Sequence, residues 1–325
     1  MKKLFLAILA LTSSTLYAQD LQLGDLNFFQ KAKSTQVNTG VKLQTFDYSF
    51  EYGTDSFDYK RSINSWENEV QYGVSEKQIV GIAFEYDLNN QLQNTSVPSG
   101  QQKAKSYNDK GLSDLTLGTG YRLLSDKIYL DLIGQFTLGL EKSESGDSDA
   151  NSSKDGNNKQ GHHSLDLSIG IGQKIEKFEW RGTFGVVRNF AGEYDSLQVG
   201  AETIKVETDS SLDMLASGSF QFRPISKFAI GLNLSWQKSD KGTSHYVDSG
   251  DKIEQTVDSY SFITSDLVAR YNFSENMLID ANYLFYNSDF HFGIKSKNTS
   301  SGATSTFKAK DYKSTGIRVG ASFLF

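Results

Sequence analysis

The sequence contains no cysteine and only two prolines among its 325 residues. Without cysteine, neither disulfides nor thiolate metal sites can hold the fold together. Proline interrupts sheets, so its scarcity allows long uninterrupted strands. The formal net charge of -6 is mild and acidic, which argues against the basic surface that a nucleic-acid partner requires. Backbone hydrogen bonds and apolar burial must therefore stabilise the fold.

Long apolar runs are also missing beyond the N-terminus. The mean hydropathy is -0.44, and no later segment reaches the ~20 apolar residues of a membrane-spanning helix. A membrane β-barrel is not detected by such a test, because its strands alternate apolar and polar side chains. Aromatic residues make up 13% of the chain, with 16 Tyr and 22 Phe. This composition favours strands.

The first residues have the pattern of a secretory signal peptide. Lys2 and Lys3 precede a short apolar run, Leu4–Leu11, and cleavage is expected after Ala18. The run is too short to span a bilayer as a helix. We therefore expect export, and a division into a signal peptide (1–18), an N-terminal segment (19–35) and one large domain (36–325).

Segments of alternating hydrophobicity fill the large domain, joined in turn by tight turns and long polar loops. In one of them, Leu130 and Leu132 share a face and Asp131 and Gln135 share the other, which is the period of a strand. The expected strands are 36–51, 58–73, 78–94, 110–124, 127–142, 161–175, 177–192, 209–223, 226–240, 255–273, 276–292 and 308–325. Short turns alternating with long loops predict an all-β fold, a transmembrane antiparallel up-and-down β-barrel of about twelve strands in a bacterial outer membrane.

A soluble β-sandwich is the alternative, since its sheets also have one wet face. Strands of about 15 residues are longer than the roughly five or six of soluble proteins. Aromatic residues also end the apolar faces, as expected for girdles at two membrane interfaces. They are Tyr121, Phe178, Trp180, Phe222, Phe228, Tyr271 and Phe323 near the tight turns, and Trp236, Phe262 and Phe285 toward the other end.

The last expected strand ends on a phenylalanine. Phe323 and Phe325 share one face of this strand, and the ending resembles the recognition signal of bacterial outer-membrane barrels. The resemblance implies that the barrel-assembly machinery recognises both residues. Outer-membrane lipid and lipopolysaccharide are the other expected partners. Nothing in the sequence marks a subunit interface, so we expect a monomer.

Two further features concern the interior of the barrel. Residues 19–35 carry Leu26, Phe28 and Phe29 in a polar setting, which fits either a periplasmic tail or a plug anchored in the lumen. The strand faces opposite the lipid carry charges, and unpaired buried charges are costly. The charges therefore either line a water-filled, charge-sorting channel or pair across a nearly closed barrel. The candidate lumen and selectivity residues are Glu69, Glu85, Asp114, Arg122, Asp131, Asp166, Arg181, Asp213, Arg223, Asp266, Arg270, Asp280 and Arg318.

No catalytic constellation emerges around the four histidines. Ser288 and Asp289 point to opposite faces of a strand, so with His291 they align poorly as a hydrolase triad. The string Asp147–Asp155 begins like a calcium loop but lacks the Gly and Glu that an EF-hand needs. We expect no enzyme, no cofactor and no metal. An adhesion barrel with binding loops and a rim-active outer-membrane hydrolase remain the alternatives to a channel.

The segment Lys110–Leu123, KGLSDLTLGTGYRL, resembles a strand of the outer-membrane proteins grouped under the meta-cleavage pathway of phenol degradation. These are similar in outline to the fatty-acid and aromatic-hydrocarbon transporter barrels. Ser113 stands where the pattern commonly has glycine. The resemblance implies a channel or transporter for a small, hydrophobic solute, with Asp114 in the lumen near the outer mouth and Arg122 near the periplasm.

Overall fold

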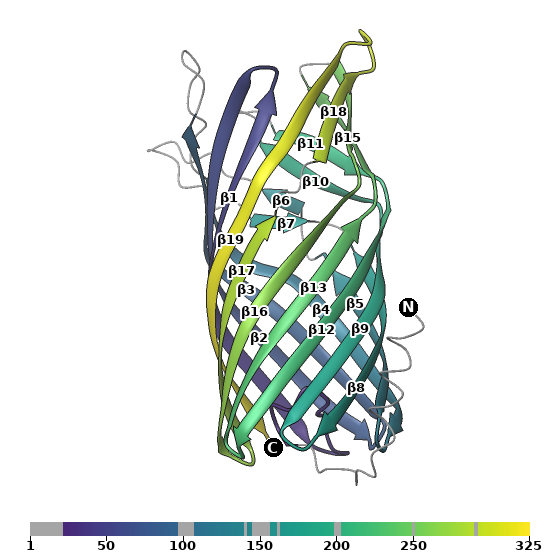
Figure 1. The fold of residues 1–325 in the computed structure, drawn as a ribbon. Coiled ribbons are helices and arrows are strands. Elements are labelled where there is room, and N and C mark those ends of the chain that lie inside the picture. Colours follow the sequence, from purple (N-terminus) through teal and green to yellow (C-terminus); the bar gives the residue numbers. More distant parts are fainter. Residues whose placement is uncertain are drawn as a thin grey trace, which may run out of the picture.

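The computed structural model describes residues 22–96, 107–139, 142–144, 157–160, 163–197, 203–248, 251–288 and 292–325. The expected signal peptide, the calcium-like string, Asp289 and His291 lie outside the described residues. Among those described, no helix has the length and apolarity needed to cross a membrane. Long antiparallel strands dominate and close into a barrel (Figure 1).

Twelve strands form the wall, which confirms the predicted all-β antiparallel barrel. In order around the wall they are β1 (Thr35–Tyr52), β2 (Asp55–Ser75), β3 (Gln78–Ser96), β4 (Tyr107–Ser125), β5 (Tyr129–Leu138), β8 (Ser164–Ile175), β9 (Phe178–Asn189), β12 (Ser211–Ile225), β13 (Phe228–Ser239), β16 (Tyr260–Ser274), β17 (Met277–Ser288) and β19 (Thr304–Leu324). The first strand closes on the last, with Gln36 opposite Leu324. Thr35 and Phe325 exchange two backbone hydrogen bonds at the end of this seam, of 2.9 and 2.8 Å.

Three connections that we expected as loops are β-hairpins. They are β10 (Gly192–Leu197) with β11 (Thr203–Thr208), β14 (Gly242–Asp248) with β15 (Asp251–Val257), and β18 (Phe292–Asn298) with the outer part of β19. β11 also pairs with β14 and β15 with β18, so the hairpins extend the wall beyond the barrel (Figure 1). A shorter hairpin joins β6 (Lys142–Glu144) to β7 (Asn157–Gln160). The loop prediction for 193–208, 241–254 and 293–307 was wrong, because these strands mix polar residues on both faces and show no apolar alternation.

Side chains in the wall alternate between an apolar outward face and a polar lumen. Phe184 and Phe220 point outward and are 54% and 57% exposed, whereas Glu179 and Gln221 point inward and are 4% and 3% exposed. Exposed apolar side chains around buried polar ones are the arrangement of a membrane barrel. One expected girdle residue is misplaced: Phe262 lines the lumen, because it lies an even number of residues from the inward-facing Asp266 on β16.

Candidate functional site

Residues 22–34, which we call the plug, lie inside the tight-turn end of the barrel, near the C-terminus (Figure 1). Leu23, Asn27 and Gln30 are only 2%, 0% and 2% exposed. A tight turn starts the segment, with the backbone N–H of Asp25 donating to the Gln22 carbonyl at 3.0 Å. Gly24 has a φ of +89°, a conformation that glycine adopts without strain. This turn directs the Asp25 side chain into the barrel wall.

Asp25 joins the plug to two wall strands through buried ion pairs. Its two carboxylate oxygens lie 2.8 Å from Lys174 Nζ on β8 and 2.8 Å from Arg223 Nη2 on β12. The Asp25 side chain is 1% exposed. A buried carboxylate shared by two cations is a strong attachment, because removing it leaves two unpaired charges.

Asn27 provides a second attachment. Its backbone N–H and its side-chain amide both donate to Glu179 Oε1, at 2.6 and 3.0 Å. Its carbonyl accepts a hydrogen bond from Arg122 Nη2 at 2.9 Å. Gly172 on β8 leaves the space for this side chain, since a Cβ there would lie 2.0 Å from Asn27 Oδ1. The plug residue thus occupies a recess in the wall.

Arg122 connects the plug to the wall with both charge and ring contacts. Its guanidinium binds both Asp131 oxygens, at 2.8 and 3.1 Å, and lies 4.4 Å from the ring centroid of Phe29. Arg181 Nη1 binds the same Asp131 carboxylate at 2.8 Å. The cation–π contact fixes the aromatic end of the plug beside this ion-pair group.

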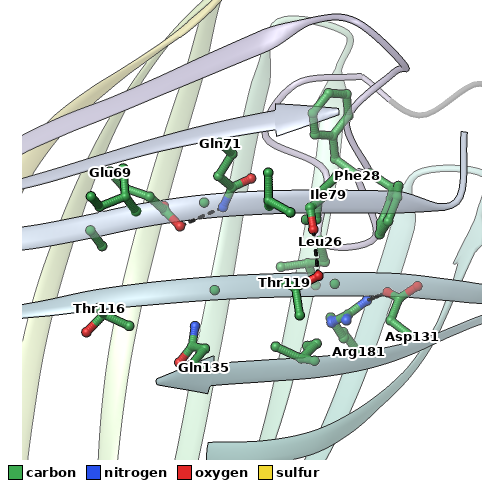
Figure 2. Close-up of a pocket in the computed structure, with 18 residues that line it drawn as sticks. Leu26, Phe28, Glu69, Gln71, Ile79, Thr116, Thr119, Asp131, Gln135 and Arg181 are labelled. Atoms are coloured by element: carbon green, nitrogen blue, oxygen red, sulfur yellow. Dashed lines mark hydrogen bonds and ion pairs between the residues drawn. The ribbon is translucent and has the colours of Figure 1, made fainter. Parts of the chain in front are cut away.

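The plug separates two cavities in the lumen. The cavity on the long-loop side has a volume of about 290 Å³ and is lined by Leu26, Phe28 and Phe29 together with β2–β5 (Figure 2). Figure 2 shows the Asp131–Arg181 pair at its edge. The cavity on the tight-turn side has a volume of about 920 Å³ and is also lined by Phe28 and Phe29. The two rings therefore form the partition between the cavities.

Gly73 allows a test of plug docking that does not involve charge. A Cβ at Gly73 would lie 1.9 Å from the Lys31 carbonyl oxygen, so Gly73→Val is expected to displace the last turn of the plug. Trypsin should then cut the detergent-solubilised barrel at Lys31 or Lys33 at least roughly ten times faster. Gly242→Val is the matched control, because a Cβ there meets nothing within 4 Å. Equal cleavage of the two variants would contradict the docking of the plug on β2.

A belt of ion pairs crosses the seam of the barrel further toward the long loops. Glu67 on β2 binds Lys42 at 2.9 Å and Arg318 at 2.6 Å. Lys42 also binds Glu85 at 2.8 Å, and Arg318 also binds Asp280 at 2.6 Å. The belt therefore links β1, β2, β3, β17 and β19.

Three other lumen carboxylates, Asp166, Asp213 and Asp266, have neutral neighbours. Asp213 accepts hydrogen bonds from the amides of Asn189 and Gln237, at 3.4 and 3.2 Å. Asp266 accepts one from Asn233 at 3.5 Å. Asp166 Oδ1 is buried without a hydrogen-bond partner among the described residues. These side chains give the lumen negative charge that the ion pairs of the belt do not neutralise.

Beyond the belt, most of the large side chains on the inward face are aromatic, and Arg61 and Lys310 lie among them. On β1 the inward residues run Lys42, Gln44, Phe46, Tyr48 and Phe50 toward the long loops. A cavity of about 510 Å³ lies among these outer rings. Its aromatic lining consists of Phe46, Tyr48, Phe50, Tyr260, Phe262, Phe292 and Tyr312. We call it the aromatic cavity. Aromatic lining is unusual for the lumen of a bacterial barrel, which is ordinarily polar.

The structure places the predicted lumen residues in three groups, and the side chain of Asp114 on β4 lies outside the described ones. Arg122, Asp131, Arg181, Arg223 and Arg270 surround the plug; Glu69, Glu85, Asp280 and Arg318 lie in or beside the belt; and Asp166, Asp213 and Asp266 have neutral partners. Sequence reasoning missed Asp25, Asn27 and Lys42 as partners, and it missed the aromatic cavity. The alternation on β1 could have revealed the cavity, since Phe46 and Tyr48 keep the parity of Lys42.

Potential metal ligands are scattered in the described part of the chain. No group of three or more His, Asp or Glu side chains there is placed to hold a metal ion. His163 accepts the Gly139 backbone N–H at Nδ1, and His245 lies 3.6 Å from Asp209. Both contacts are with single neighbours at exposed positions.

Comparison with known proteins gives the fold. No family model and no curated protein matches the sequence. An outer-membrane channel from Pseudomonas putida F1 has a similar structure, with a TM-score of 0.57 and 13% identity over 94% of this chain and 100% of that one. The P. putida toluene transporter TodX has a TM-score of 0.43 and 9% identity, with 92% of this chain and 91% of that chain covered. The Escherichia coli outer-membrane protease OmpT has a TM-score of 0.39 and 8% identity, with 97% of this chain and 100% of that chain covered. The first likeness shows that this chain has the fold of an outer-membrane barrel.

Proposed function

We propose that this barrel is an outer-membrane channel for small, mainly apolar molecules, which it takes up at the aromatic cavity. The observation that carries the proposal is the cluster of seven inward-facing rings beyond the belt. Burying rings in a lumen is favourable only where apolar surface covers them, and a bound apolar solute would supply that surface. The resemblance of Lys110–Leu123 to the phenol-pathway proteins points to the same class of solute.

The cavities define a path for the solute. It leads from the aromatic cavity, past the belt, to the cavity above Phe28 and Phe29. The same two rings border the cavity at the periplasmic end. In this proposal passage requires the plug to move, and the arrangement described above corresponds to a closed channel.

Uptake of an uncharged fluorescent aromatic amine, N-phenyl-1-naphthylamine, tests the proposal in whole cells. Cells carrying the barrel should admit the probe faster than cells lacking it. The double variant Tyr48→Ala/Phe262→Ala should slow the added uptake by roughly 5- to 100-fold, since each lost ring contact is worth ~0.5–1.5 kcal/mol.

The control is Phe184→Ala/Phe220→Ala, which removes two rings from the outward face and should leave uptake nearly unchanged. The proposal fails if the barrel adds no uptake, or if the two double variants behave alike. Surface abundance and heat-modifiable migration show that each variant is assembled.

A further inference from the structure

The ion pairs around the plug contain more cations than carboxylates. Asp25 and Asp131 are each shared by two cations, and the third carboxylate, Glu179, accepts amides of Asn27 and Gln221. Five cations surround these three carboxylates: Arg122, Lys174, Arg181, Arg223 and Arg270. Arg270 lies opposite Asp280 of the belt on β17, donates to the Gln221 amide oxygen and packs against the plug, 3.6 Å from a Cβ built on Gly24. We call this group the basic layer.

The lumen beyond the basic layer has the opposite imbalance, and the carboxylates named below outnumber the cations even when Arg61 and Lys310 of the aromatic cavity are counted. In the belt, two cations are shared by three carboxylates: Lys42 and Arg318 by Glu67, Glu85 and Asp280. Glu69 beside the belt accepts from the amides of Asn38 and Gln71, at 2.8 and 2.6 Å. Asp166, Asp213 and Asp266 add carboxylates with neutral partners. We call these carboxylates and the belt the acidic layer.

A charged solute thus meets two fields of opposite sign in sequence. An anion that enters from the outside is repelled by the acidic layer. A cation is attracted there, but the basic layer then opposes its passage past the plug. Low-dielectric walls focus such fields along a lumen, whereas an uncharged solute experiences neither barrier.

From this charge distribution we infer that the lumen rejects small ions of both signs and that its cargo is uncharged. The inference rests on the proposed channel function and deepens it by excluding ionised apolar acids and protonated aliphatic amines from the cargo. The residues that determine the selection are Asp166, Asp213 and Asp266 against anions and Arg270 against cations.

Three probes with one aromatic body test the inference in cells carrying the full-length barrel. They are N-phenyl-1-naphthylamine, its anionic 8-sulfonate, and a derivative with a trimethylammonium group. The barrel should increase entry of the uncharged probe at least tenfold more than entry of either ion. Equal increases for all three overturn the charge filter alone. No increase for the uncharged probe overturns the proposed channel and the filter with it.

Two variants separate the two layers. The triple variant Asp166→Asn/Asp213→Asn/Asp266→Asn should raise entry of the anion at least fivefold and leave the cation excluded. Arg270→Gln should raise entry of the cation at least fivefold and leave the anion excluded. A purely structural role for these residues would change entry of all three probes together, so parallel changes would contradict the inference.

The matched control for the triple variant is Asp126→Asn/Asp251→Asn/Glu76→Gln. It makes the same change of net charge at three exposed positions outside the lumen, and should leave selectivity as in the wild type. If the triple variant does not show heat-modifiable migration, the test relies on Arg270→Gln, which alters only one side chain. Cation entry into cells with this variant that is no higher than with the wild type would overturn the charge filter.

Discussion

Asp25→Ala is expected to convert a closed barrel into one that conducts ions across a planar bilayer. Release of the plug would remove the narrow passage in which the two charge layers exclude ions, so the charge filter applies to the barrel with its plug docked. The substitution leaves Lys174 and Arg223 buried without their shared carboxylate. Breaking a buried ion pair from one side costs about 3–5 kcal/mol. The wall strands keep their own hydrogen-bond ladder, so the cost falls on the docking of the plug. The open fraction should therefore rise by roughly 100-fold or more, recorded as single-channel open time.

Asp126→Ala is the control for this result. Asp126 lies in a tight turn at the same end of the barrel and is exposed, so its loss should leave conductance at the wild-type level. Heat-modifiable migration confirms that both variants are folded barrels. An Asp25→Ala barrel that is folded and remains as silent as the control would show that the plug does not depend on this contact.

Glu67→Ala is expected to have the largest effect on the stability of the wall itself. Glu67 bridges Lys42 and Arg318 across the seam between the first and last strands. Each cation keeps one other carboxylate, so the expected loss lies below that of a fully broken buried pair, at about 2–3 kcal/mol. The measurement is reversible urea unfolding in lipid vesicles, followed by tryptophan fluorescence.

Glu51→Ala provides the comparison at the same seam. Glu51 pairs with Lys310 between the same two strands, but both side chains are about a third exposed. Exposed pairs contribute about 0–1 kcal/mol, so this variant should unfold almost as the wild type does. Equal destabilisation by the two substitutions would show that burial of the belt does not strengthen its ion pairs.

Local alternation predicted most of the wall correctly. On β5, Leu130 and Leu132 against Asp131 and Gln135 sufficed to separate the outward face from the lumen, because strand side chains alternate with a period of two. The same rule placed Arg122 and Arg318 in the lumen. Phe262 was placed wrongly because this rule was not applied to it. It was assigned to the lipid-facing girdle as an aromatic residue, although it lies an even number of residues from the inward-facing Asp266.

Local periodicity thus predicts the fold class and which residues of the twelve wall strands share a face. How the lumen is closed depends instead on contacts between distant segments. Asp25 meets Lys174 and Arg223 across 149 and 198 residues of chain, and Glu67 meets Arg318 across 251. Such contacts depend on the closure and register of the whole barrel, which bring distant strands to opposite sides of one narrow space. No local pattern contains that information, so the contacts that attach the plug and the ion pairs of the belt appear only when the barrel is closed.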